Sequence, residues 1–154
     1  MRNTTSLRGR AGVGHGRVHW SANFDEIHDF ENDIRNGFLG TGLLTNADFK
    51  STSATLGNPK AGKSSDLDAL AAYVTSLDTF AKSPHRKWAG GLRDPAVLGK
   101  VIFESKGCAK CHGGAEYTDS PQGNRHDVGT INDDSDLRLG AVPSTHLTTP
   151  TLAA

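Results

Sequence analysis

The chain is poor in cysteine, methionine and long apolar runs. Its 154 residues include two cysteines and a single methionine, Met1. Two cysteines do not supply the two ligand pairs that a structural zinc site usually needs. No apolar run approaches the ~20 residues of a membrane-spanning helix, and the first residues, Arg2 to Arg8, lack the apolar segment of a secretory signal. Seventeen basic residues balance seventeen acidic ones, which disfavours nucleic acid and anionic membranes as partners.

Apolar side chains are also scarce for a chain of this length. Hydrophobic residues make up 35% of the sequence, and there are 18 glycines. This composition predicts long loops and a protein core that a bound group would help to fill.

Helical periodicity appears in three places. The first predicted helix covers residues 24–36, with Asn23 and Glu26 as its cap and Gly37 as its end; one further turn is expected near 47–50. The clearest helix covers residues 66–81 behind a Ser65/Asp68 capping box. Its buried face is expected to consist of Leu67, Leu70, Ala71, Val74 and Leu77.

The third predicted helix leads directly to the cysteines. Asp94 is expected as its N-cap and Pro95 as its first residue, and the helix should end at Gly107. Its apolar face, expected to turn inward, comprises Val97, Leu98, Val101 and Ile102. The sequence indicates no strand, so the predicted fold class is all-α with long irregular loops.

The run Cys108-Ala109-Lys110-Cys111-His112 carries the most specific chemistry. Cys-x-x-Cys-His is the attachment sequence of c-type haem. Both thiols add across the porphyrin vinyl groups, and the adjoining histidine ligates the iron. A thioredoxin-like thiol pair would instead follow a strand, whereas a helix precedes this run. The motif therefore predicts one covalent haem held by Cys108, Cys111 and His112.

Residues 57–64 match the phosphate-loop pattern of nucleotide-binding proteins. Such a loop follows a buried hydrophobic strand, but the preceding residues 49–55 are polar. An apolar strand ending in an acidic residue, which would hold magnesium, is also missing. We therefore interpret the pattern as a turn and cap before the 66–81 helix, and a nucleotidase as a weak third function class.

Seven histidines offer candidates for a second axial iron ligand. His126, downstream of the motif, is the preferred sixth-ligand candidate, although each single histidine is more often a loop residue. His15 and His19 have the four-residue spacing of metal ligands on a helix, but the glycines beside His15 favour a loop. Calcium could bind an acidic cluster, more often simply solvated, formed by Asp133, Asp134 and Asp136.

Beyond the haem motif, the chain resembles bacterial dihaem cytochrome c peroxidase-like proteins, which include the methylamine-utilisation-type dihaem enzymes. The resemblance covers nearly the whole chain, and its specificity lies in the order of the segments. These are residues 3–9, 17–35, 66–77 with Ser83-Pro84, 107–120, 126–130, 138–140 and 149–152.

The resemblance implies two cytochrome c-like domains in tandem. Residues 1–83 correspond to the C-terminal part of a first domain without its haem motif, residues 84–93 to a linker, and residues 94–154 to the N-terminal part of a second, haem-bearing domain. The family's sixth ligand to the second haem, a Met or Tyr, would lie beyond this sequence. We therefore expect a chain truncated at both ends, from a periplasmic or otherwise extracytoplasmic parent.

The resemblance also implies functional roles outside the motif. Trp20 resembles a tryptophan that relays electrons between two haems, although a packing role is equally consistent. Glu26 or Glu31 could correspond to the distal glutamate of peroxide chemistry, but both also suit a helix face. The expected function is an electron-transfer module of a dihaem peroxidase-like oxidoreductase, served by a second haem domain and a small redox protein as electron donor. The chain alone is not expected to be active, and a non-catalytic haem-bearing interaction or adaptor domain is the alternative.

Overall fold

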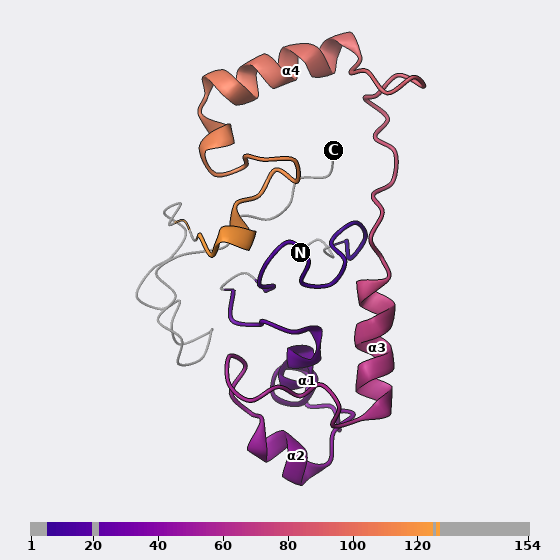
Figure 1. Cartoon of the computed structure of the whole chain (residues 1–154), viewed down its shortest axis with the longest axis vertical. Helices are drawn as coiled ribbons and strands as arrows, with labels where there is room; N and C mark the ends of the chain where they lie inside the picture. Colours follow the sequence, from indigo (N-terminus) through magenta and orange to yellow (C-terminus); the bar gives the residue numbers. More distant parts are fainter. Residues whose placement is uncertain (1–5, 20–21, 125, 127–154) are drawn as a thin grey trace.

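The computed structural model describes residues 6–19, 22–124 and 126. Within these residues the chain is helical, and its only β-structure consists of isolated bridges. The all-α expectation is thus confirmed at the level of secondary structure. Helices α1, α2 and α3 lie together in one part of the molecule, and α4 lies apart at the other end (Figure 1). We refer to the described residues 6–81 as the N-terminal unit and to 84–124 with 126 as the C-terminal arm.

The first helical segment changes pitch along its length. The predicted 24–36 helix is confirmed apart from its first turn. Its predicted cap is wrong, because Asn23 is hydrogen-bonded to His19 and the Glu26 carboxylate instead accepts the backbone N–H of Lys60 at 2.5 Å. Three short helices follow one another: η1 (Ile27–Asp29), α1 (Phe30–Asn32) and the π-helix η2 (Asp33–Gly37).

Helix α2 (Asn46–Ser51) confirms the turn predicted near residues 47–50. Its N-cap is Thr45, whose hydroxyl accepts the backbone N–H of Asp48 at 3.1 Å. The residues before the phosphate-loop pattern are therefore helix and turns. The strand that a nucleotide-binding loop must follow is replaced here by a helix.

Helix α3 (Ser65–Thr75) begins one residue earlier than predicted and ends earlier than residue 81. The predicted capping box is wrong. The N-cap is Ser64, whose hydroxyl accepts the backbone N–H of Leu67 at 3.3 Å. Asp68 does not serve the helix end, because its carboxylate bonds to the backbone N–H of Gly62 at 2.9 Å.

The hydrophobic core lies between one face of α3 and the residues around η1. Leu67, on α3, is buried in this core, and burial of such a side chain stabilises the fold by roughly 1.5–3 kcal/mol. Leu70, predicted on the buried face, is instead exposed. The core cluster consists of Val18, Phe24, Ile27, Ala71 and Val74. This small core holds the N-terminal unit together.

A fully buried carboxylate ties the loop after η2 to α1. Glu31 is 0% exposed and accepts hydrogen bonds from Arg35 Nε at 2.7 Å and from the backbone N–H groups of Leu43 and Leu44 at 2.9 and 3.0 Å. Burial alone would raise the pKa of Glu31, but these donors outweigh it and hold the pKa below its ordinary value.

A second buried charge fixes the loop before α3. Lys60 is 0% exposed, and its Nζ lies 2.6 Å from Asp29 Oδ1. Burial raises the pKa of Asp29, although Lys60 opposes this shift by favouring the carboxylate. Beside the small apolar core, buried polar contacts therefore hold the loops at residues 43–44 and at Lys60 in place.

The C-terminal arm is far less buried. Helix α4 (Asp94–Ser105) confirms the predicted helix, with Pro95 in its first turn and Arg93 rather than Asp94 at the N-cap. The expectation that its apolar face turns inward is wrong, because α4 has no buried residue. The short helices η3 (Cys108–Lys110) and η4 (Ser120–Gln122) follow. None of the helices in the described part of the chain combines the length and apolarity needed to cross a membrane.

The arm touches the N-terminal unit near η4. Gly16 lies so close to Ser120 that a Cβ at residue 16 would stand 2.7 Å from the Ser120 backbone. His15 Nε2 lies 3.6 Å from the carboxylate of Glu116. Figure 1 shows the orange segment after η3 running toward the indigo N-terminal loop. The segment that follows the cysteines is thus anchored, whereas α4 is not.

Candidate haem-attachment site

The Cys-x-x-Cys-His motif forms one tight turn directly after α4. Gly107 adopts a φ of 74°, which ends the helix and turns the chain into η3. Cys108 is exposed and Cys111 is half-buried. The backbone N–H of His112 donates to the Cys108 carbonyl at 2.9 Å. The motif is thus already folded into a compact turn with a thiol accessible from outside.

The imidazole of His112 is oriented by the backbone. Its Nδ1 lies 3.2 Å from the Tyr117 carbonyl oxygen. Because a carbonyl oxygen only accepts, Nδ1 carries the proton and Nε2 keeps its lone pair. This is the usual arrangement of a metal-ligating histidine, in which one ring nitrogen donates to a carbonyl and the other binds the metal.

The carbonyl that orients His112 comes from a strained residue. Tyr117 has a φ of 51°, a left-handed conformation that costs a non-glycine residue roughly 1–2 kcal/mol. The ring of Phe103, on α4, lies 6.0 Å from the Tyr117 ring and 6.4 Å from the His112 ring, measured between centroids. These aromatic contacts connect the end of α4 with the histidine and hold the turn in place.

His126 lies beside the motif and is engaged through both ring nitrogens. Its Nδ1 lies 3.4 Å from Cys111 Sγ, and its Nε2 lies 2.7 Å from Asp119 Oδ2. To ligate iron, His126 would have to leave one of these partners. Its role as a sixth ligand therefore stays a prediction, and its observed contacts are with Cys111 and Asp119.

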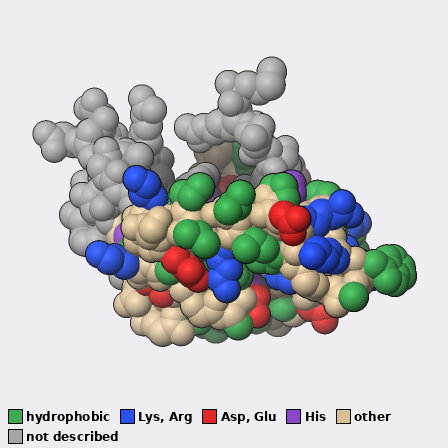
Figure 2. Space-filling view, turned by 90° about the horizontal axis from the view of Figure 1, so that it is seen from above, with side chains coloured by type: hydrophobic (Ala, Val, Ile, Leu, Met, Phe, Trp, Pro, Cys, Tyr) green, Lys and Arg blue, Asp and Glu red, His purple; other side chains and the backbone are tan. Residues whose placement is uncertain are grey.

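An apolar surface on α4 precedes the motif. Val97, Leu98, Val101 and Ile102 are between 46% and 67% exposed. Seen from the α4 end, hydrophobic side chains share this face with charged ones (Figure 2). A haem presents large apolar faces, so an exposed apolar helix face next to the two thiols fits such a group.

Comparisons with known protein families, curated proteins and solved structures find no match to this chain. In the described part of the chain, no three or more His, Cys, Asp or Glu side chains converge as a metal site. The cysteine pair thus does not belong to a preassembled four-ligand zinc site among those residues.

The candidate distal glutamates lie in the N-terminal unit, and both have structural partners there. Glu31 holds the 43–44 backbone, and Glu26 accepts the N–H of Lys60. A role for either in peroxide chemistry stays a prediction. Outside the described residues lie the possible relay Trp20, Met1 and the acidic cluster Asp133, Asp134 and Asp136.

His15 and His19, which have the spacing of metal ligands on a helix, do not form a shared site. His15 lies near Glu116, whereas His19 lies 3.3 Å from Asp33 and 2.9 Å from Asn23. Both histidines lie in non-helical chain, as the glycines beside His15 predicted.

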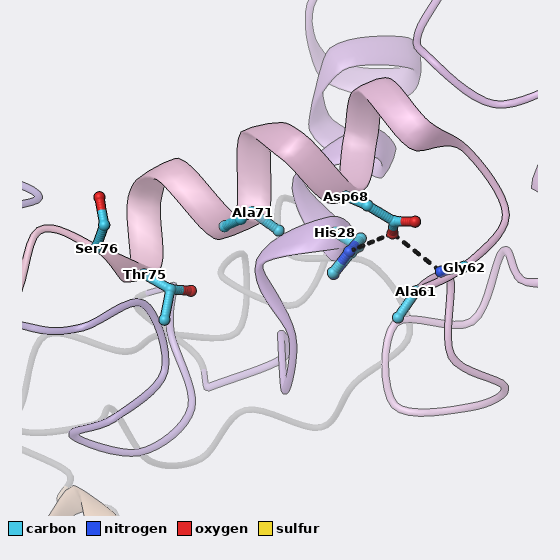
Figure 3. A pocket seen from close by; sticks show the side chains of 8 residues that line it. His28, Ala61, Gly62, Asp68, Ala71, Thr75 and Ser76 are labelled. Carbon is cyan, nitrogen blue, oxygen red and sulfur yellow. Dashed lines mark hydrogen bonds and ion pairs between the residues drawn. The ribbon is translucent and has the colours of Figure 1, made fainter.

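An open groove along α3 is the second feature with polar groups. His28 Nε2 lies 3.0 Å from Asp68 Oδ1, which also accepts the N–H of Gly62 (Figure 3). Alanine and threonine side chains of α3 complete its lining. The groove presents the Asp68 carboxylate and has no Lys or Arg among its lining residues, so its charge disfavours a phosphate.

Two contributors to the site were missed by sequence reasoning. The Tyr117 carbonyl acts through the backbone, and Asp119 contacts His126, which lies beside Cys111. A backbone acceptor leaves no side-chain signal, so no motif could have revealed it. The short spacing between His126 and the motif was the only available hint of a contact.

Proposed function

We propose that the chain is a c-type haem-binding electron-transfer module of a dihaem cytochrome c peroxidase-like oxidoreductase. The observation that carries this proposal is the hydrogen bond from His112 Nδ1 to the Tyr117 carbonyl, which leaves Nε2 as a ligand beside Cys108 and Cys111.

Each residue of the motif has a separate task. The thiols of Cys108 and Cys111 would each add S–H across one vinyl double bond, which forms two thioether bonds without an external oxidant. His112 would hold the haem iron through Nε2. The bound haem would supply one-electron iron redox chemistry.

The surroundings of the motif support electron transfer more than turnover. A peroxidase needs an open coordination position with an acid–base group beside it. Glu31 is completely engaged by Arg35 and the 43–44 backbone, and lies in the N-terminal unit. The proposed module therefore relays electrons in a larger periplasmic protein whose second haem domain carries the reaction, with a small redox protein as donor.

The decisive experiment replaces both thiols. The double variant Cys108→Ala/Cys111→Ala, made in a host with a cytochrome c maturation system, should lose all covalent haem in a pyridine haemochrome assay. Lys110→Ala is the matched control, because Lys110 lies inside the motif but provides no bond to haem, and it should keep one haem per chain. Covalent haem that survives loss of both thiols would refute the proposal.

The adaptor alternative differs in the behaviour of the iron. Reduced wild-type protein that binds carbon monoxide and is oxidised quickly by peroxide would indicate a reactive haem. A low-spin haem inert to carbon monoxide but reversibly reducible supports the electron-transfer module. A haem that exchanges electrons with no donor would instead favour the non-catalytic interaction domain.

A further inference from the structure

The segment between the two helical parts is a folded hairpin with a tryptophan at its tip. A β-bridge joins Arg86 to Leu92, and the backbone N–H of Lys87 donates to Gly91 O at 2.7 Å. Arg86 Nη1 also donates to Gly90 O at 3.0 Å. The sequence predicted only a linker here. We call residues 82–93 the Trp88 hairpin, because these bonds hold Trp88 out at its end.

Trp88 is 94% exposed, the most exposed large hydrophobic side chain among the described residues. Lys82 Nζ lies 4.6 Å from the centroid of its ring, so a cation rests on the indole. Tryptophan is the residue type that most often carries binding energy at protein interfaces. A hydrogen-bonded turn therefore presents a largely exposed indole, contacted by Lys82, as an anchor for an interface.

The hairpin carries charge of one sign. Between residues 79 and 93 there is no Asp or Glu. The cationic or titratable side chains there are Lys82, His85, Arg86, Lys87 and Arg93. Their acidic neighbour Asp94 lies 3.9 Å from Lys87 Nζ, and because both side chains are exposed, this ion pair contributes little to stability. The chain as a whole has no net charge, so the hairpin is a local basic patch.

We propose that the Trp88 hairpin docks on a partner protein whose acidic surface surrounds an apolar pocket for the indole. The basic side chains would pair with carboxylates at the rim, and Trp88 would fill the centre, which is the usual anatomy of a protein interface. The hairpin and the haem motif lie at opposite ends of α4, a helix of 12 residues. Docking therefore leaves the cysteines accessible and does not depend on haem.

A protein fits this patch better than a membrane does. Binding to a bilayer scales with buried apolar area, and the hairpin offers one large apolar side chain at its tip. Lys82 sits on the indole and would be carried toward the acyl chains. On an acidic protein, an apolar pocket would hold the indole and carboxylates at its rim would pair with the Lys82 ammonium.

The test uses defined polymers as probes for the full chain. Fluorescently labelled random copolymer of glutamate and tyrosine supplies carboxylates with aromatic rings, and polyglutamate of equal length supplies carboxylates alone. Anisotropy titrations at low salt should show about fivefold tighter binding of the copolymer, the effect of one aromatic contact. Trp88→Ala should abolish this preference and leave polyglutamate binding unchanged.

Matched lysine variants separate a local patch from general charge. Lys82→Gln/Lys87→Gln should weaken both polymers by about tenfold or more, since two contacts with carboxylates are lost. Lys50→Gln/Lys63→Gln removes two exposed lysines outside the hairpin and should change neither affinity. Equal affinities for both polymers, an unaffected Trp88→Ala variant, or tighter binding to phosphatidylglycerol vesicles would each overturn the proposal. These titrations are repeated on Cys108→Ala/Cys111→Ala protein, where the same result is expected without haem.

Discussion

Helices α3 and α4 are similar in length and in apolar pattern but differ in what covers them. Helix α3, Ser65–Thr75, buries Leu67, Ala71 and Val74 against the residues around η1. Helix α4, Asp94–Ser105, buries none of its residues, and its Val, Leu and Ile side chains are exposed. An amphipathic pattern therefore predicts a helix, but it does not say whether protein atoms cover its apolar face.

The difference between the helices separates a part of the molecule with a buried apolar core from a part whose helix buries no residue. The N-terminal unit has an apolar core and buried ion pairs of its own. The C-terminal arm has an oriented histidine, two thiols and an uncovered helix. If the proposed function is right, haem covers the apolar face of α4. Mutations in the two parts should therefore change stability by different amounts.

The largest expected difference concerns two glutamates. Glu31→Ala removes the acceptor of Arg35 and two backbone N–H groups, so it should lower the free energy of unfolding by about 3–5 kcal/mol. Glu104→Ala removes an exposed residue whose carboxylate lies 3.8 Å from Lys100, and should change it by less than about 0.5 kcal/mol. Urea denaturation measures both, and a comparable cost at the two sites would contradict the comparison.

Apolar truncations sharpen the same contrast. Leu67→Ala opens a cavity in the core and should cost about 2–5 kcal/mol with or without haem. Val101→Ala should cost less than about 0.5 kcal/mol in haem-free protein, since Val101 is exposed, but about 1 kcal/mol once haem is attached. Denaturation of both forms tests this, and an equal cost of Val101→Ala in the two forms would mean that haem does not cover α4.

Two glycines with positive φ extend the comparison to the backbone. A Cβ at Gly42, where φ is 71°, would collide with the Glu31 carboxylate and the Arg35 guanidinium. Gly42→Ala should therefore cost about 2–3 kcal/mol, from strain plus disrupted hydrogen bonds. At Gly90, where φ is 97°, nothing lies within 4 Å of a new Cβ, and Gly90→Ala should cost only about 1 kcal/mol of backbone strain. Thermal unfolding of both variants measures the two costs. A larger loss of stability in Gly90→Ala than in Gly42→Ala would contradict the packing described at Gly42.

The smallest effect is a pH dependence confined to the N-terminal unit. Because the folded pKa of Glu31 is below its ordinary value, its stabilisation is present above the unfolded pKa and is lost as the pH falls through the folded pKa. The difference in stability between wild type and Glu31→Gln should shrink in acid, by at most about 1.4 kcal/mol per pH unit.

Asp29 provides a control of opposite sign for that pH dependence. Burial raises its folded pKa, so its contribution falls as the pH rises from the unfolded to the folded pKa. The difference between wild type and Asp29→Asn should thus change in the opposite direction over that window. Parallel slopes for the two variants, measured by urea denaturation across acid pH, would contradict these assignments.

Sequence reasoning located the helices well and their caps poorly. A helix is present in each of the three predicted places, because apolar periodicity is a sum over many residues, although α3 ends at Thr75 and not near residue 81. Each predicted N-cap was wrong: the N-caps are Glu26, Ser64 and Arg93, and of these only Ser64 caps its helix with a side-chain hydrogen bond. Asp68, for example, bonds to Gly62 and His28, two partners outside its helix.

Part of the candidate site could likewise be predicted from the sequence, and part of it depends on the tertiary structure. The motif from Cys108 to His112 is readable because its five residues are contiguous and their chemistry is covalent. The structural role of Glu31 could not be predicted from the sequence, since a glutamate on a helix face can be a catalytic residue or a buried structural one. Only the position of the 43–44 backbone decides between these uses.

By itself, the sequence determined where the helices form and that two thiols and a histidine share one turn, because these depend on neighbouring residues. Tertiary structure decided which helix face is covered, which carboxylates are engaged and which nitrogen of His112 keeps its lone pair. The last choice depends on the Tyr117 carbonyl, held by a left-handed φ of 51°. Such contacts depend on where separate segments meet, and local residue preferences do not encode that meeting.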